Sequence, residues 1–194
     1  MKRVGIVGEH YDHDAGALKK LLEHKYNDDE VLFVPLLKTL KGKQLNRIRK
    51  VKELLEREMQ RHNLDFIVYV RDLDGLPSEQ EKINKLEKWF QQVKVDNNGF
   101  LFILIFELEA LILADIQTFN QLYKVKISFK TNPLHKPNPK EFLKAQTAKT
   151  NKKYHESHTS EIFEASDFDE IISKHKGERS FQSFIQELDE KLGI

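Results

Sequence analysis

The chain has 194 residues, of which 39% are hydrophobic and 32% charged, and this composition predicts one soluble globular domain, or one domain with a small appendage. It contains no cysteine, which excludes a disulfide framework, a thiolate nucleophile and a cysteine-ligated zinc site. The longest apolar run, residues 100–106, is too short to span a membrane, and the N-terminus has no signal-peptide core, so we expect a cytoplasmic protein without membrane contacts.

Four short apolar runs predict strands, at residues 3–7, 31–34, 66–70 and 100–106. The segments between them have helical periodicity, at residues 14–25, at 43–62, and after a capping box predicted at residues 78–81. Strands that alternate with helices predict βαβ units, and hence an α/β, TOPRIM-like (Rossmann-like) sandwich with a mainly parallel sheet of about four strands flanked by helices. If the first strand neighbours the third, the strand order is 2-1-3-4.

The periodicity weakens after residue 117. Residues 131–140 contain three prolines and predict an extended loop, and helices are predicted at residues 141–148, 168–173 and 180–192. We therefore expect a catalytic domain at residues 1–118 and a C-terminal helical and loop extension at residues 119–194, packed on that domain.

Acidic residues follow three of the predicted strands. Glu9 follows the first strand, Asp72 and Asp74 the third, and Glu107 and Glu109 the fourth, so all are expected at the same edge of a parallel sheet. Residues two apart on a strand share a face, so Asp72 and Asp74 are expected to project together. Neighbouring carboxylates repel each other unless a cation lies between them or one is protonated, and oxygen ligands suit Mg²⁺ or Mn²⁺. A lone Asp-x-Asp is also common in solvated turns.

The formal net charge is only +1, but the charges are unevenly distributed. Residues 38–52 contain seven lysines and arginines and no acid, and residues 124–153 contain nine lysines and a single acid. Residues 156–170 contain six acids and no lysine or arginine. The basic segments predict contacts with nucleic-acid phosphates, with Arg47, Arg49, Lys50, Lys136 and Lys140 as candidates; ordinary solvated surface explains these segments equally well.

A second group of candidates is weaker. His10, Asp12 and His13 follow the first strand, where they could bind a transition metal or shuttle protons, although a polar loop at the start of a helix also explains them. Asp115 lies six residues after Glu109, roughly 240° around a helix, so the two side chains cannot share one helical face. A structural hydrogen bond to a neighbouring loop explains Asp115 better than metal ligation does.

Taken together, a strand ending in Glu and a later strand ending in Asp-x-Asp resemble the TOPRIM domain, the metal-binding catalytic fold of topoisomerases, primases and OLD-family nucleases. More narrowly, the chain is similar to DUF4276, a small family of unknown function with OLD-type TOPRIM character. Five segments in the same order carry the resemblance, at residues 7–9, 72–74, 109–115, 136–143 and 179–184. The chain departs from the family pattern at Gly8-Glu9-His10, where relatives have Glu-Gly, and at Leu111, where they have Trp.

The resemblance implies a metal-dependent nuclease that hydrolyses the phosphodiester bonds of DNA or RNA. In this chain Glu9, Asp72 and Asp74 would be catalytic, and Mg²⁺ or Mn²⁺ would be held by these three residues and Glu109. The resemblance also implies a role in anti-phage defence with an ABC-type ATPase as partner. A haloacid-dehalogenase-like phosphatase has its Asp-x-Asp after the first strand, so it fits poorly. A non-catalytic TOPRIM-like subunit that binds an ATPase or nucleic acid is the alternative.

Overall fold

The computed structural model describes residues 1–27, 29–40, 42–96 and 98–194, and it divides into two compact units. Unit 1 consists of residues 1–71 and 78–103, and unit 2 consists of residues 72–77 and 104–194. Lys41, in the basic segment at residues 38–52, and Asn97, before the fourth strand, lie outside the described residues. The domains predicted at residues 1–118 and 119–194 stay a prediction, because compactness does not show which segments act independently.

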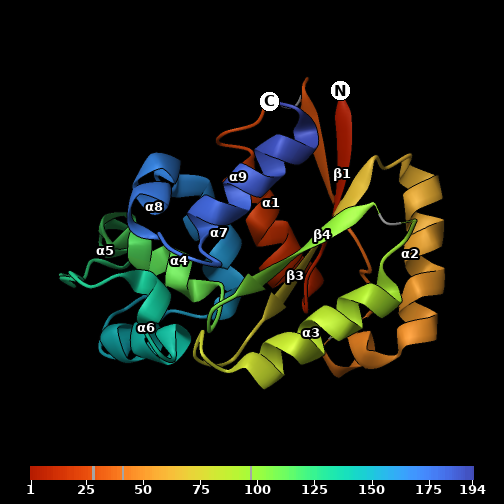
Figure 1. Cartoon of the computed structure of the whole chain (residues 1–194). Helices are drawn as coiled ribbons and strands as arrows, with labels where there is room; N and C mark the ends of the chain where they lie inside the picture. Colours follow the sequence, from red (N-terminus) through yellow and green to blue (C-terminus); the bar gives the residue numbers. More distant parts are fainter. Residues whose placement is uncertain (28, 41, 97) are drawn as a thin grey trace. The chain divides into compact units, whose positions relative to one another are not determined.

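Within the described residues a sheet is formed by four strands, β1 (Lys2–Val7), β2 (Val31–Pro35), β3 (Phe66–Asp72) and β4 (Gly99–Leu104). Their order is β2-β1-β3-β4, as predicted (Figure 1). The β1 strand runs parallel to both β2 and β3. Hydrogen bonds from Ile67 N to Asn98 O and from Leu73 N to Leu104 O advance six residues along each strand, so β4 is also parallel to β3. The predicted parallel α/β sheet is therefore confirmed.

Helices cover both faces of the sheet in unit 1. The α1 helix (Ala17–Leu22) joins β1 to β2, whereas α2 (Ile48–His62) leads back to β3 and α3 (Gln80–Val93) continues to β4. Because such crossovers are right-handed, the change of direction after β2 places α1 on one face and α2 and α3 on the other (Figure 1).

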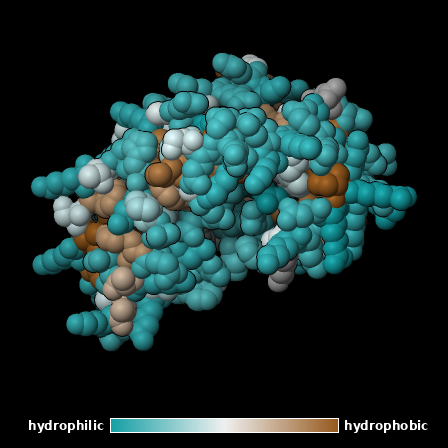
Figure 2. Space-filling view, turned by 60° about the horizontal axis from the view of Figure 1, so that its bottom comes forward, coloured by the Kyte–Doolittle hydropathy of each residue, from teal (hydrophilic) through white to brown (hydrophobic). Residues whose placement is uncertain are grey.

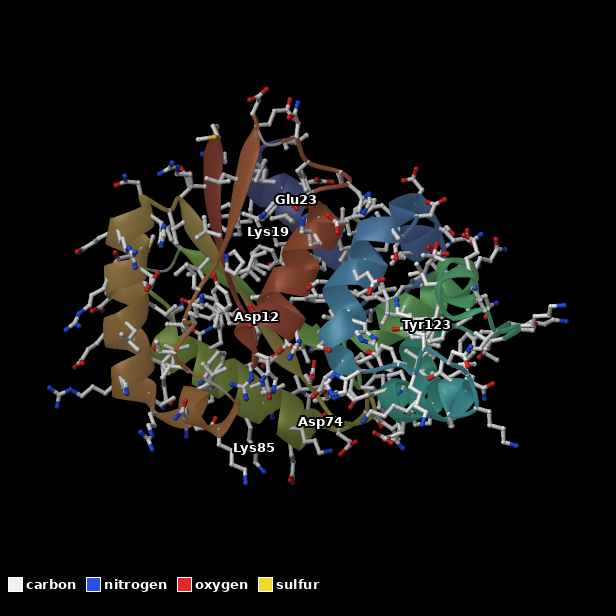
Figure 3. All side chains as sticks on the ribbon, turned by 180° about the vertical axis from the view of Figure 1, so that it is seen from behind. Asp12, Lys19, Glu23, Asp74, Lys85 and Tyr123 are labelled. Carbon is white, nitrogen blue, oxygen red and sulfur yellow. The ribbon has the colours of Figure 1, made fainter. Side chains whose placement is uncertain are left out.

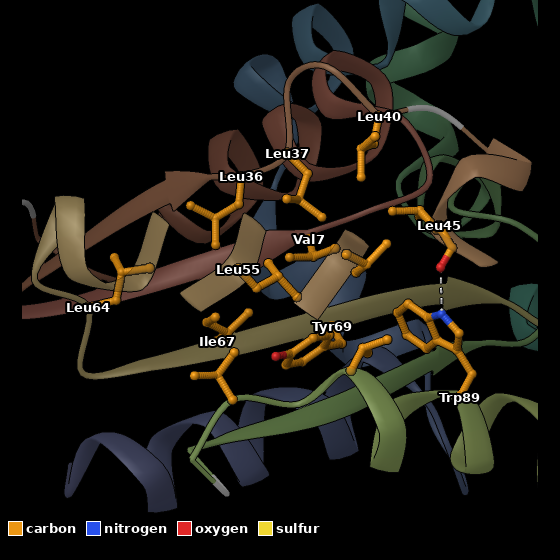
Figure 4. Packing of buried hydrophobic residues seen from close by; sticks show 13 residues of the cluster. Val7, Leu36, Leu37, Leu40, Leu45, Leu55, Leu64, Ile67, Tyr69 and Trp89 are labelled. Carbon is orange, nitrogen blue, oxygen red and sulfur yellow. Dashed lines mark hydrogen bonds between the residues drawn. The ribbon is translucent and has the colours of Figure 1, made fainter. Parts of the chain in front are cut away.

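The core under α2 and α3 is built from alternate strand residues. Val7, Ile67 and Tyr69 enter it from β1 and β3, and Trp89 enters it from α3 (Figure 4). The indole N–H of Trp89 donates to the carbonyl oxygen of Leu45 at 2.9 Å, so its polar atom is satisfied inside the core. Trp89 is therefore a core residue.

The β4 strand begins with a glycine that the packing requires. A Cβ atom at Gly99 would lie 2.5 Å from the carbonyl oxygen of Ile67 and 2.9 Å from the ring of Tyr69. Any larger residue would push β4 away from β3 at this point, so Gly99 allows the close approach of the two strands.

Unit 2 is helical. All six residues of α4 (Glu109–Ala114) are buried, although the helix begins with a glutamate. Five elements of the same unit pack around α4, namely α5 (Ile116–Tyr123), the short 3₁₀ helix η3 (Pro133–His135), α6 (Pro139–Thr147), α7 (Thr159–Ala165) and α8 (Phe168–Lys174). The α9 helix (Phe181–Leu192) packs against α8, and η4 (Glu156–His158) precedes α7. A helix that is buried all round is the centre of a helical core.

Several local predictions differ from the structure in unit 1. The predicted capping box is wrong, because α3 begins at Gln80 with Glu79 as its N-cap and no side chain caps it. The helix predicted at residues 14–25 starts earlier, as the π-helix η1 (Tyr11–Gly16), and ends with α1. The helix predicted at residues 43–62 begins as the 3₁₀ helix η2 (Gly42–Asn46).

In unit 2 the predicted extended loop at residues 131–140 contains η3, and α6 starts at Pro139, where proline at the first helical position needs no hydrogen-bond partner. Neither α5 nor α7 was predicted, whereas the helices at residues 168–173 and 180–192 are confirmed within one residue at each end. Among the described residues, no helix has both the length and the apolar character needed to cross a membrane.

Candidate functional site

The turn after β1 is tightly packed. A Cβ atom on Gly8 would lie 2.5 Å from the Cβ of Asp14, so a glycine is needed where η1 folds back onto the strand end. A carboxylate oxygen of Asp14 accepts the backbone N–H of His10 at 2.7 Å. Burial raises the pKa of Asp14, although the bond from His10 opposes this shift. A π-helix is rare and is frequently found at functional sites, which draws attention to this turn.

The other candidates in this turn are less enclosed. His10 and Asp12 are exposed, and His13 is half-buried. The rings of His10 and His13 lie 6.1 Å apart between centroids and are tilted by 49°, so they are neighbours on the same short turn.

Glu9 makes an ion pair within unit 1. The Nε–H of Arg71 donates to Glu9 Oε1 at 2.9 Å, and the side chain of Arg71 is 11% exposed and that of Glu9 28%. The guanidinium also lies over the ring of Trp89, 4.5 Å from its centroid. Arg71 Nη1 is buried and has no hydrogen-bond partner among the described residues. The charge of Glu9 is therefore balanced by a nearly buried cation that a metal ion would have to replace.

Asp72 and Asp74 lie on the turn that leads out of β3. Asp72 is the last residue of the strand. Asp74, which is labelled in Figure 3, has a left-handed backbone with φ of 49°. The turn, and not strand alternation, therefore sets the direction of Asp74. Asp74 N lies 3.4 Å from Phe106 O, so this acidic turn runs beside the segment that ends in Glu107. Both aspartates belong to unit 2, as does Glu107.

A lysine connects the acids that follow β4 with a later segment. Lys140 Nζ lies 3.5 Å from Glu107 and 3.3 Å from Glu156, and the backbone N–H of Lys140 donates to Glu107 at 3.2 Å. Burial works against the charge of Lys140, but Glu109, Glu107 and Glu156 outweigh it and raise the pKa of this lysine. Lys140 therefore stays charged at neutral pH.

Glu109 has a different environment from the other acids. It is 5% exposed, and its carboxylate accepts the hydroxyl of Tyr154 at 3.0 Å. Burial raises the pKa of Glu109 to about 7, although Lys140 lowers it. The pKa of Tyr154 is raised by burial and then by Glu109, so the phenol keeps its proton and remains a donor. Glu109 thus exchanges a proton near neutral pH while Tyr154 does not.

Asp115 has a structural role. It is the N-cap of α5, where it accepts Thr118 N–H at 3.2 Å, and its second oxygen accepts Asp167 N–H at 2.8 Å. Both carboxylate oxygens thus hold backbone groups, one of them in a loop 52 residues away.

The predicted nucleic-acid contacts are divided between the units. Arg47, Arg49 and Lys50 are exposed at the start of α2 in unit 1, where Arg49 pairs with Glu53 at 2.9 Å. In unit 2, Lys136 Nζ lies 4.5 Å from the centroid of the Phe142 ring. Lys140 is half-buried and pairs with two glutamates.

No group of three or more histidine, aspartate or glutamate side chains is gathered closely enough to hold a metal ion within the described parts of the chain. The predicted ligands are distributed over both units, with Glu9 in unit 1 and Asp72, Asp74 and Glu109 in unit 2. Sequence reasoning did not identify Arg71 as a partner of Glu9. The one feature of the sequence that could have pointed to Arg71 is that it directly precedes Asp72. No spacing in the sequence connects Tyr154 to Glu109.

Comparison with known proteins gives a family but no function. A family model with the description "Domain of unknown function (DUF4276)" matches residues 14–189, which is more than half of the chain. The matched region includes the acidic turn and the acids after β4 but begins after Glu9. Neither the curated proteins nor the solved structures that were searched gave a match.

Proposed function

The chain belongs to the DUF4276 family, and from that premise we propose that it is a Mg²⁺- or Mn²⁺-dependent nuclease of TOPRIM type that hydrolyses phosphodiester bonds in DNA or RNA. The observation that carries the proposal is the pairing of the two turns after β3 and β4, which places Asp74 beside the segment leading to Glu107. The resemblance to OLD-family nucleases supports a role in anti-phage defence together with an ABC-type ATPase.

The carboxylates after β3 suit a Mg²⁺ or Mn²⁺ ion that keeps part of its water shell. Mg²⁺ is usually held by one or two carboxylates, with water and substrate phosphates completing its shell. Asp72 and Asp74 provide two carboxylates on one turn, so a preformed group of three protein ligands is not required. We propose Glu9 and Glu109 as further ligands. To bind the ion, Glu9 would have to give up its ion pair with Arg71, and Glu109 its hydrogen bond from Tyr154.

Within this proposal the residues have distinct roles. A bound divalent ion activates water and stabilises the charge that develops on the leaving oxygen. Lys140, which is held charged by its glutamates, would orient a substrate phosphate beside Glu107. Arg47, Arg49 and Lys50, exposed at the start of α2, would contact backbone phosphates of the nucleic acid.

The test compares two aspartates of unit 2. Wild type, Asp74→Ala and Asp169→Ala are incubated with plasmid, linear DNA and transfer RNA, with Mg²⁺, Mn²⁺ or EDTA, and with or without the ATPase. Asp74→Ala should lose cleavage and keep nucleic-acid binding, whereas Asp169→Ala, altered at an exposed position of α8, should retain both. Cleavage in EDTA, or equal cleavage by Asp74→Ala, would contradict the mechanism.

A second function is favoured by one feature of unit 1. The Glu9–Arg71 ion pair removes an expected metal ligand, as it would in a subunit that binds an ATPase or nucleic acid without cutting. On the face in Figure 2 hydrophilic side chains predominate and hydrophobic ones form small groups, so a partner on this face would meet a mainly polar surface. Binding of nucleic acid without cleavage in the presence of the ATPase would decide for this function.

A further inference from the structure

Unit 2 contains a pocket that the proposed nuclease site does not use. It has a volume of about 470 Å³ and lies between the end of α5 and the turn that follows α6. This volume is within the range of small-molecule sites. Its lining includes the buried Tyr123 (Figure 3) and a set of polar residues, Lys124, Lys149, Thr150, Asn151 and Lys152.

Hydrogen bonds hold the backbone on both sides of this pocket. Lys124 is the left-handed C-cap of α5, with φ of 53°. The chain that follows it is fixed by the Asn120 side chain, which donates to Ile127 O at 2.8 Å and accepts Ile127 N–H at 2.9 Å. On the other side, the Thr150 hydroxyl lies 2.9 Å from Thr147 O. The lysine-bearing segments therefore need little ordering when a ligand binds.

The pocket is positively charged. Lys152 pairs with Glu161 at 2.7 Å and lies over the Tyr123 ring at 5.0 Å. Lys124 and Lys149 are exposed and take part in no ion pair among the described residues. Three lysines against one glutamate leave a net charge of +2 at the pocket. Two unpaired ammonium groups next to the side-chain amide of Asn151 suit an anion with several oxygens.

We propose that this pocket binds a phosphate group, supplied by a nucleotide or by a nucleic-acid strand, with Lys124 and Lys149 as its principal cations. The site is independent of the acidic turn and of divalent ions. If the phosphate belongs to a nucleic-acid strand, the pocket adds an anchoring contact to the nuclease function proposed above, and in that form the inference rests on that function.

Binding is measured in EDTA at low salt, by calorimetry, with pyrophosphate, ATP and a single-stranded oligonucleotide as separate probes. Wild type is compared with Lys124→Gln/Lys149→Gln and with a charge-matched control, Lys126→Gln/Lys130→Gln, whose lysines are exposed on the segment after α5. The pocket variant should bind at least one probe about tenfold more weakly or not at all, whereas the control should bind like wild type.

The pattern across probes identifies the source of the phosphate. Binding of pyrophosphate and ATP alone assigns the pocket to a free nucleotide. Binding of the oligonucleotide, with a smaller salt dependence in the pocket variant, assigns it to a strand. No binding of any probe by wild type, or equal weakening by the control, would overturn the proposal. Because Asp74→Ala should bind these probes like wild type, failure of the nuclease proposal leaves this result unaffected.

Discussion

Two glutamates that follow parallel strands, a partly exposed one in unit 1 and a buried one in unit 2, have partners of different charge. In unit 1, Glu9 faces the guanidinium of Arg71 at 2.9 Å and shares it with the ring of Trp89. In unit 2, Glu109 accepts a hydrogen bond from the neutral phenol of Tyr154 and is almost completely buried. The first arrangement balances the charge with a cation, and the second leaves burial to raise the pKa to about 7. Burial, and not the place of Glu109 after a strand, therefore raises the pKa of this acid.

The largest expected effect is on the pH dependence of the free energy of unfolding, and it comes from Glu109. Its folded pKa of about 7 lies above its ordinary value of 4.5, so the proton stabilises the fold below pH 4.5. This stabilisation is lost as the pH rises from 4.5 to about 7, and it amounts to about 3 kcal/mol. Urea titrations between pH 4 and 8 should show the free energy of unfolding of wild type falling by this amount relative to that of Glu109→Gln.

The control for this experiment is Glu141→Gln, an exposed site of α6 that should keep the wild-type slope. Another buried group titrates in an overlapping window. Burial lowers the pKa of His175 from 6.5 to about 4, so stability falls as the pH decreases through that range. His175 is present in all three proteins, so its contribution cancels in their differences. Identical slopes for wild type and Glu109→Gln would contradict the proposed environment of Glu109.

On the Glu9 side, we expect the free energy of unfolding to fall by about 2 kcal/mol in Glu9→Ala, because Arg71 is left nearly buried without its counterion. The value is below that of a fully buried pair, since Glu9 is 28% exposed. Denaturant unfolding at pH 7 measures the change. The double variant Glu9→Ala/Arg71→Met should recover part of the loss, and strict additivity would show that the ion pair contributes nothing.

Removing the phenol hydroxyl of Tyr154 should have a smaller effect on the free energy of unfolding. Tyr154→Phe deletes the hydrogen bond to Glu109, and we expect a loss of about 1 kcal/mol in the free energy of unfolding. Because this bond lowers the pKa of Glu109, the pH midpoint of the stability loss should also move upward. Tyr11→Phe, at a half-buried position of η1, serves as the control. An unchanged midpoint would show that Tyr154 does not tune Glu109.

The smallest expected effect tests whether Glu9 belongs to the proposed metal site. Arg71→Gln removes the competing cation, so Mn²⁺ should bind about threefold more tightly, which corresponds to about 0.7 kcal/mol. The shift in Tm with Mn²⁺ concentration measures this affinity. Arg49→Gln, which breaks the exposed pair with Glu53, should leave it unchanged. No change in Arg71→Gln would remove Glu9 from the set of ligands.

The strands were predictable because each is a compact apolar run, and the order followed from placing the first strand beside the third. Short helices such as α5 and α7 were not, because helices of this length form only when tertiary packing supports them. The predicted acids were recognisable as acids after strands. Their partners were not, since Glu9 and Arg71 lie 62 residues apart and Glu109 and Tyr154 lie 45 apart, and no local pattern connects them.

The membership of residues 72–77 in unit 2 also has a consequence for the order of folding. The acidic turn finds its backbone partners, Leu104 and Phe106, only about thirty residues later in the chain. During synthesis the N-terminal part emerges first, so a nascent chain that stops before Leu104 has made Asp72 and Asp74 without the segment that fixes their turn. A protein built in this way cannot assemble its proposed ion-binding turn until the last strand of the sheet has left the ribosome.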